Sequence, residues 1–181
     1  MDRMKPRFDV IGQLGSMRRY ARSLTRDAID AEDVVHDALV RAYERRETFR
    51  QGDSLRAWLL SVLHNSFIDG VRSRRAEAAR VVQSGYLAEI RMEPHQDHVV
   101  RLAQVREAFL DLPEEQRSAL HLVAVEGLSY QEAASALDIP LGTLMSRIGR
   151  ARASLREMED NVAGQPKSRL RIVGGCDDRD S

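Results

Sequence analysis

Basic and hydroxyl side chains recur at helical spacing between positions 143 and 154. Thr143, Arg147, Arg150 and Ser154 are spaced by 4, 3 and 4 residues, and Ser146 joins them. Side chains three and four residues apart are neighbours on one face of a helix. Arginine binds phosphates and guanine edges, and serine or threonine can reach either. The pattern favours contact with nucleic acid, although an ordinary helical hairpin with a solvated basic face has the same spacing.

The segment around this face carries the signals of two short helices joined by a tight turn. Gly127 suits the end of a preceding helix, and Ser129 with Glu132 forms a capping box that starts the next. Pro140 suits the first position of the second helix, which we expect to end near Glu157. An apolar stripe lies on its other side: Leu144, Ile148, Ala151 and Leu155. The pattern predicts a helix-turn-helix, whose second helix enters the major groove of DNA.

This segment resembles the domain of bacterial sigma factors that reads the promoter −35 element, specifically in the extracytoplasmic-function (ECF) group. The matching residues run in register: Gly127, Ser129, Tyr130, Glu132, Ala134, Leu137, Ile139, Pro140, Gly142, Thr143, Ser146, Arg147, Arg150, Ala151 and Leu155. Leu112-Pro113 followed by Gln116-Arg117 also resembles the family. The resemblance implies −35 contacts by Thr143, Ser146, Arg147, Arg150 and Ser154.

Acidic residues gather in the N-terminal part of the chain, where a second helix is expected from about residue 31. Its predicted apolar stripe runs from Val34 to Tyr43. Asp30, Asp33, Asp37 and Arg41 lie on another face, at spacings of 3, 4 and 4. Acids early in a helix also favour its dipole, but that effect fades beyond the first turn. The stretch resembles the sigma-factor helix that grips the clamp helices of RNA polymerase, which implies that these four residues bind the β′ subunit.

A loop and a long helix follow, and their residue order resembles the ECF −10-reading element. The resemblance is carried by Phe49, Arg50, Trp58-Leu59, Asn65, Asp69 and Arg72. It implies that Phe49 stacks on a base flipped from the melting strand and that Asn65 bonds to its edge. Arg72, Arg74 and Arg75 would hold phosphates, with Arg50 and Asp69 in the same element. A solvated basic helix end, with Phe49 tucked into the core, is the other interpretation.

Composition favours an all-α protein of two small helical domains joined by a flexible linker, the C-terminal one a helix-turn-helix. Aromatic residues make up 5% of the 181 residues and charged residues 31%, and the formal net charge is zero. We expect a sigma region 2 domain, a linker, a sigma region 4 domain and a disordered tail at 10–77, 78–98, 99–157 and 158–181 respectively.

No other chemistry is indicated. His95 and His98 lack nearby cysteine or histidine partners, and the single Cys176 has no base beside it, so no metal, cofactor or catalytic site is expected. No apolar run is long enough to span a membrane, and the N-terminus lacks a signal-peptide core. We therefore expect a cytoplasmic protein that is not an enzyme.

The resemblance implies an ECF-type sigma factor that binds core RNA polymerase through its β′ and β subunits and directs transcription initiation at promoter DNA. We expect it to act in a stress response and to be held by an anti-sigma factor. Two alternatives stay open. A dimeric helix-turn-helix repressor or activator would give the acidic helix no purpose. A sigma mimic that sequesters an anti-sigma factor should have lost Arg147, Arg150, Phe49 and Asn65, yet all four are present.

Overall fold

The computed structural model describes residues 9–50, 52–80 and 97–163. All the elements named in these ranges are helical, which confirms the all-α class. The predicted tail lies mostly outside them, as do His95, Cys176 and most of the predicted linker.

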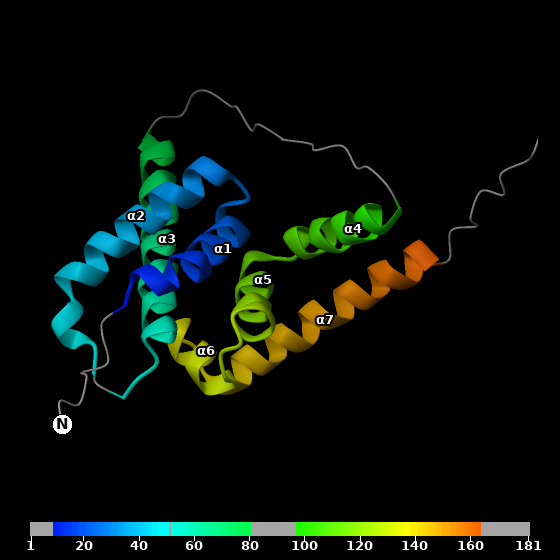
Figure 1. Cartoon of the computed structure of the whole chain (residues 1–181). Coiled ribbons are helices and arrows are strands. Elements are labelled where there is room, and N and C mark those ends of the chain that lie inside the picture. The colour runs from blue at the N-terminus through cyan, green and yellow to red at the C-terminus, as the bar shows by residue number, and fades with distance from the viewer. Residues whose placement is uncertain (1–8, 51, 81–96, 164–181) are drawn as a thin grey trace, which may run out of the picture.

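Three long helices form an N-terminal unit, which is blue to teal in Figure 1. Its elements are a short 3-10 turn η1 (Ile11–Gln13), α1 (Leu14–Thr25), α2 (Ala28–Glu44), a second turn η2 (Arg46–Thr48) and α3 (Leu55–Arg80). Asp27 caps α2, because its side chain accepts hydrogen bonds from the amides of Ile29 and Asp30 at 2.7 and 2.9 Å. The helices enclose large buried side chains that include Met17, Tyr20, Leu59 and Leu63.

Four helices and a π-helical turn form a C-terminal unit. They are α4 (Asp97–Asp111), α5 (Glu114–Leu120), η3 (His121–Val125), α6 (Tyr130–Ala136) and α7 (Leu141–Ala163). Their core includes Leu112, Leu122, Leu144 and Ile148.

The local signals at the helix-turn-helix are confirmed. Ser129 and Glu132 form both bonds of the capping box at the start of α6. Gly127 has a φ of 69°, the left-handed conformation that glycine adopts without steric cost. In the turn between α6 and α7, Asp138 also has a positive φ, of 52°. The helix α7 ends at Ala163, so the predicted end near Glu157 was wrong: no glycine or proline occurs before Gly164.

The two units pack against each other rather than lying apart. Helix α1 contacts α5, and α3 contacts α6; Figure 1 shows α6 beside one end of α3. The buried apolar side chains of both units form one continuous cluster. The sequence predicted two units joined by a linker, but it gave no information on how they are placed relative to each other.

Candidate DNA and polymerase interfaces

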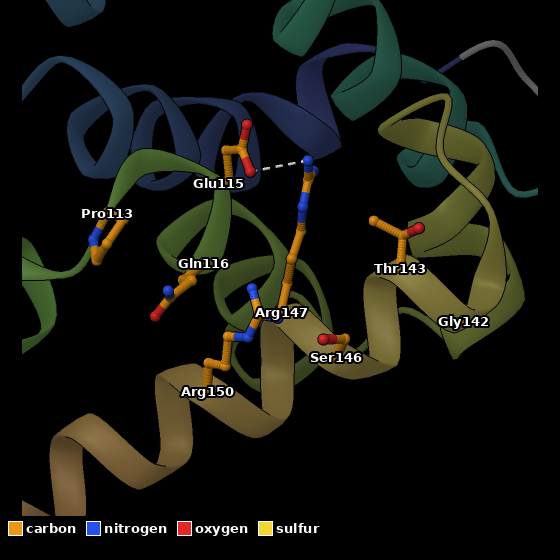
Figure 2. A pocket seen from close by; sticks show the side chains of 8 residues that line it. All are labelled: Pro113, Glu115, Gln116, Gly142, Thr143, Ser146, Arg147 and Arg150. Carbon is orange, nitrogen blue, oxygen red and sulfur yellow. Dashed lines mark ion pairs between the residues drawn. The ribbon is translucent and has the colours of Figure 1, made fainter.

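The basic face of α7 borders an open cavity between α7 and α5. Four of the five predicted −35 residues line it, with a cavity volume of about 460 Å³: Thr143, Ser146, Arg147 and Arg150, together with Pro113, Glu115, Gln116 and Gly142. Figure 2 shows the side chains of Arg147 and Arg150 extending from α7 on the side that faces α5. The fifth residue, Ser154, lies further along α7, is half-buried and does not line the cavity.

Arg147 is held by an acid that the sequence interpretation missed. Its Nη2 atom lies 2.9 Å from Oε2 of Glu115, the contact dashed in Figure 2. The Arg147 side chain is 22% exposed and that of Glu115 is 70% exposed. Arg150 is exposed and has no acidic partner within the described part of the chain. Glu115 was assigned only to the first turn of its helix, and residue spacing gives no sign that α5 and α7 bring it to Arg147.

The substitution Glu115→Gln is expected to raise the affinity of the chain for duplex DNA about two- to fivefold at low salt. The carboxylate competes with DNA for Arg147, and an exposed ion pair of this kind is worth about 0.2–1 kcal/mol. The slope of log affinity against log salt concentration should steepen by roughly one, for one more phosphate contact. Fluorescence anisotropy across a salt series measures both. Glu107→Gln, which neutralises another exposed acid of the C-terminal unit, is the matched control, and equal effects of the two variants would refute the competition.

The acidic face of α2 carries exposed apolar side chains as well. Asp30, Asp33 and Asp37 are exposed, as predicted for a docking face. Along the same helix Ile29 is 76%, Val40 46% and Tyr43 67% exposed. The assignment of Tyr43 to the buried stripe was therefore wrong. Its ring instead lies under the guanidinium of Arg46, whose Cζ is 4.6 Å from the ring centroid, because the buried face of α2 ends at Ala42.

Arg41 and Asp69 were assigned to different partners but contact each other. Arg41 Nη1 lies 2.5 Å from Asp69 Oδ2, which links α2 to α3. Both side chains are partly exposed, at 35% and 52%. The pair places the predicted polymerase-binding face directly beside the predicted −10 face.

The predicted −10 residues lie on one side of α3 and on the loop before it. Asn65, Asp69 and Arg72 are exposed at spacings of 4 and 3 along α3, and Arg74 and Arg50 are also exposed. Arg75 belongs to α3, but its side chain lies outside the described residues. Phe49 is half-buried with its ring centroid 5.6 Å from that of Trp58, at 55°. The partly buried position of Phe49 leaves both interpretations of this residue, base stacking and core packing, in place.

Charged and polar side chains meet where the two units join, and burial shifts their pKa values. The Glu126 carboxylate is fully buried. Burial alone would raise its pKa, but hydrogen bonding from His121, Arg19 and Ser16 lowers it to about 2. Burial lowers the pKa of His64 to about 4, and the charge of Arg147 adds to this.

Two further groups at this junction are also shifted by burial. Burial raises the pKa of the Tyr20 hydroxyl above its ordinary value, and it lowers the pKa of the Arg117 guanidinium. None of these buried groups was singled out as functional from the sequence.

Neither a metal site nor a membrane span occurs in the part of the chain that the structure describes. No group of three or more histidine, cysteine or acidic side chains there could hold a metal ion. No helix in these ranges is long and apolar enough to cross a membrane.

Comparisons with known proteins match both units. Residues 13–77 match the model of Sigma-70 region 2, and residues 102–155 match that of Sigma-70, region 4. The ECF RNA polymerase sigma factor EcfG of Rhodopseudomonas palustris is 36% identical over 149 residues, which cover 82% of each chain.

Solved structures agree with these matches. The sigma factor RpoE of Bartonella quintana, in complex with the anti-sigma factor NepR, is similar with a TM-score of 0.72 and 31% identity, over 83% of this chain and 94% of that one. The anti-anti-sigma factor PhyR from the same organism has a TM-score of 0.51 at 17% identity, over 82% of this chain and 49% of that one, and shares the fold alone. With both regions matched in order and a relative of this identity and coverage, the chain belongs to the ECF group of sigma-70 RNA polymerase sigma factors.

Proposed function

We propose that this chain binds core RNA polymerase and directs promoter-specific initiation of transcription. The observation that carries the proposal is the presence of both sigma regions, in the order and spacing of the relatives, each with its predicted contact face exposed. On this proposal the chain acts in the cytoplasm beside the polymerase, which performs the catalysis, and needs no cofactor of its own.

The C-terminal unit reads the −35 element through α7. Ser146 and Arg150 are exposed at the N-terminal half of α7, the part of a recognition helix that meets base edges. Thr143 and Arg147 line the same cavity and are half-buried, so they suit contacts to the DNA backbone. Ser154 lies further along the helix, where phosphate contact is the role open to it.

The N-terminal unit supplies polymerase binding and −10 recognition. The exposed acids Asp30, Asp33 and Asp37 are interleaved with Ile29 and Val40, and such a mixed face suits a partner helix with basic and apolar side chains. For the −10 element, Asn65 bonds to an extruded base and Phe49 stacks on it. The exposed arginines Arg50, Arg72 and Arg74, with Arg75, hold phosphates, while Asp69 orients Arg41 at the boundary of the two faces.

An anti-sigma factor is the proposed regulator. The support is that the similar Bartonella quintana sigma factor RpoE was solved in complex with the anti-sigma factor NepR. A stress response is the proposed setting. A sigma mimic is the second candidate, because PhyR shares the fold, but Arg150 and Asn65 are present and exposed here, whereas a mimic has no use for them.

Run-off transcription with core polymerase and a promoter library tests the proposal. The wild-type chain is expected to initiate at a discrete promoter class. The double variant Arg147→Ala, Arg150→Ala should lose at least about tenfold of that initiation, because each well-placed arginine contributes about 1–3 kcal/mol. Arg106→Ala, which removes an exposed arginine of α4, should leave it unchanged. Absence of initiation by the wild type, with tight binding to a small regulator, would favour the mimic.

A further inference from the structure

A buried ion pair joins the two units. The carboxylate of Glu126, at the end of η3, is fully buried. Arg19 of α1 donates to both of its oxygens, from Nε to Oε1 and from Nη2 to Oε2, each at 3.1 Å. Arg56 of α3 donates from Nη1 to the Glu126 carbonyl oxygen at 3.2 Å, and from Nε to the Gln13 side chain at 3.1 Å. Two arginines of the N-terminal unit therefore converge on one residue of the C-terminal unit.

A second charged group crosses the junction in the opposite direction. Arg117 of α5 is 3% exposed, and its Nε donates to the Ser23 carbonyl oxygen at 2.6 Å. Its Nη2 lies 3.4 Å from the carbonyl oxygen of Leu24. These carbonyls belong to the C-terminal turn of α1, whose dipole favours a cation.

Aromatic rings fill the space between these charged contacts. The ring centroids of Tyr20 in α1 and His121 in η3 are 5.2 Å apart. The Tyr20 hydroxyl lies 3.0 Å from Nδ1 of His64 in α3. The junction is thus a packed, hydrogen-bonded interface rather than a loose contact.

This closed arrangement is too small to reach both promoter elements at once. Elements centred near −10 and −35 are about 25 base pairs apart, or roughly 85 Å along B-DNA at about 3.4 Å per base pair. A compact chain of this length has a radius of gyration of about 16 Å and is roughly 40 Å across. Segment 81–96, between α3 and α4, can span up to about 55 Å when extended, so the connection permits the units to separate.

We propose that the contacts of Glu126 and Arg117 with the N-terminal unit keep the free chain closed, and that core polymerase must break this interface before one chain contacts both promoter elements. The inference rests on the proposed function. A closed state that cannot bridge the elements lowers the apparent affinity for polymerase and promoter by the fraction of chains that are open.

Energy transfer between two dyes measures the opening directly. In a Cys176→Ser background, the exposed residues Ala76 of α3 and Gln104 of α4 are replaced by cysteine and labelled. The free wild-type chain should show high transfer, and adding core polymerase should lower it. The double variant Arg19→Ala, Arg56→Ala should lower it without polymerase.

The matched control is Arg18→Ala. Arg18 adjoins Arg19 in α1, but its Nε lies 3.0 Å from Glu32 Oε2, inside the N-terminal unit, so transfer should stay at the wild-type level. In run-off assays, the double variant should also reach half-maximal initiation at about threefold less core polymerase. Wild-type transfer that polymerase leaves unchanged, or equal transfer in the double variant and the control, would overturn the inference. No initiation by the wild type at any polymerase concentration would instead refute the proposed function, whatever the transfer shows.

Discussion

Replacing Arg117 with alanine is expected to lower the free energy of unfolding by about 3–5 kcal/mol. The guanidinium donates to the carbonyl oxygens of Leu110 and Leu112 at 3.0 and 2.6 Å and to those of Ser23 and Leu24 across the junction. Bonds from a charged donor contribute about 1.5–3 kcal/mol each, and buried carbonyls without a donor cost about 1–3 kcal/mol. These terms are not additive, but even one or two of them are large beside a total stability of about 5–15 kcal/mol.

Urea unfolding at neutral pH measures the change, followed both by circular dichroism and by the fluorescence of the single Trp58 in α3. Arg117→Lys should be intermediate, because an ammonium keeps the charge but cannot donate to carbonyls on both sides with a planar fork. Arg106→Ala removes an exposed arginine of α4 and should cost less than about 0.5 kcal/mol. If Arg117→Ala matched that control, the bonds to α1 and to the α4–α5 turn would contribute nothing measurable.

Local features of this fold could be predicted because they depend on neighbouring residues. The Ser129–Glu132 capping box and the left-handed Gly127 are determined within a few positions, and both occur as predicted. The alternation of Leu144, Ile148 and Ala151 on one face of α7 likewise identifies its buried side. Such signals gave the all-α class and the helix-turn-helix.

Features that depend on distant pairing could not be predicted in this way. Nothing next to Glu126 or Arg19 in sequence indicates that they meet, since 107 positions separate them. The same holds for Glu115 and Arg147, because spacing identifies a helix face but not the element that faces it. Tyr43 shows a related limit: a helical stripe predicts burial only as far as the neighbouring helix extends.

The stability of the chain is expected to fall as the pH is lowered from about 6.5 to 4, and His64 is the main cause. Burial, aided by the charge of Arg147, lowers the pKa of His64 from 6.5 to about 4. Between these values the unfolded chain binds a proton at His64 and the folded chain does not, so the free energy of unfolding rises with pH. The full difference corresponds to about 3 kcal/mol. Glu126 acts in the next window down: its pKa is about 2 instead of 4.5, so its contribution is lost between those values.

Chemical denaturation from pH 7 to 5 isolates His64, because Glu126 stays ionised there in both states. His64→Asn is expected to remove up to about 1.4 kcal/mol per pH unit from the slope of stability against pH. Asparagine can still bond the Tyr20 hydroxyl, which lies 3.0 Å from His64 Nδ1, so its effect at pH 7 should be small. His36→Asn, at an exposed position of α2, should keep the wild-type slope. A slope that His64→Asn leaves unchanged would mean that the imidazole accepts a proton as readily in the folded chain as in the unfolded one, which the packing around Tyr20 and Arg147 opposes.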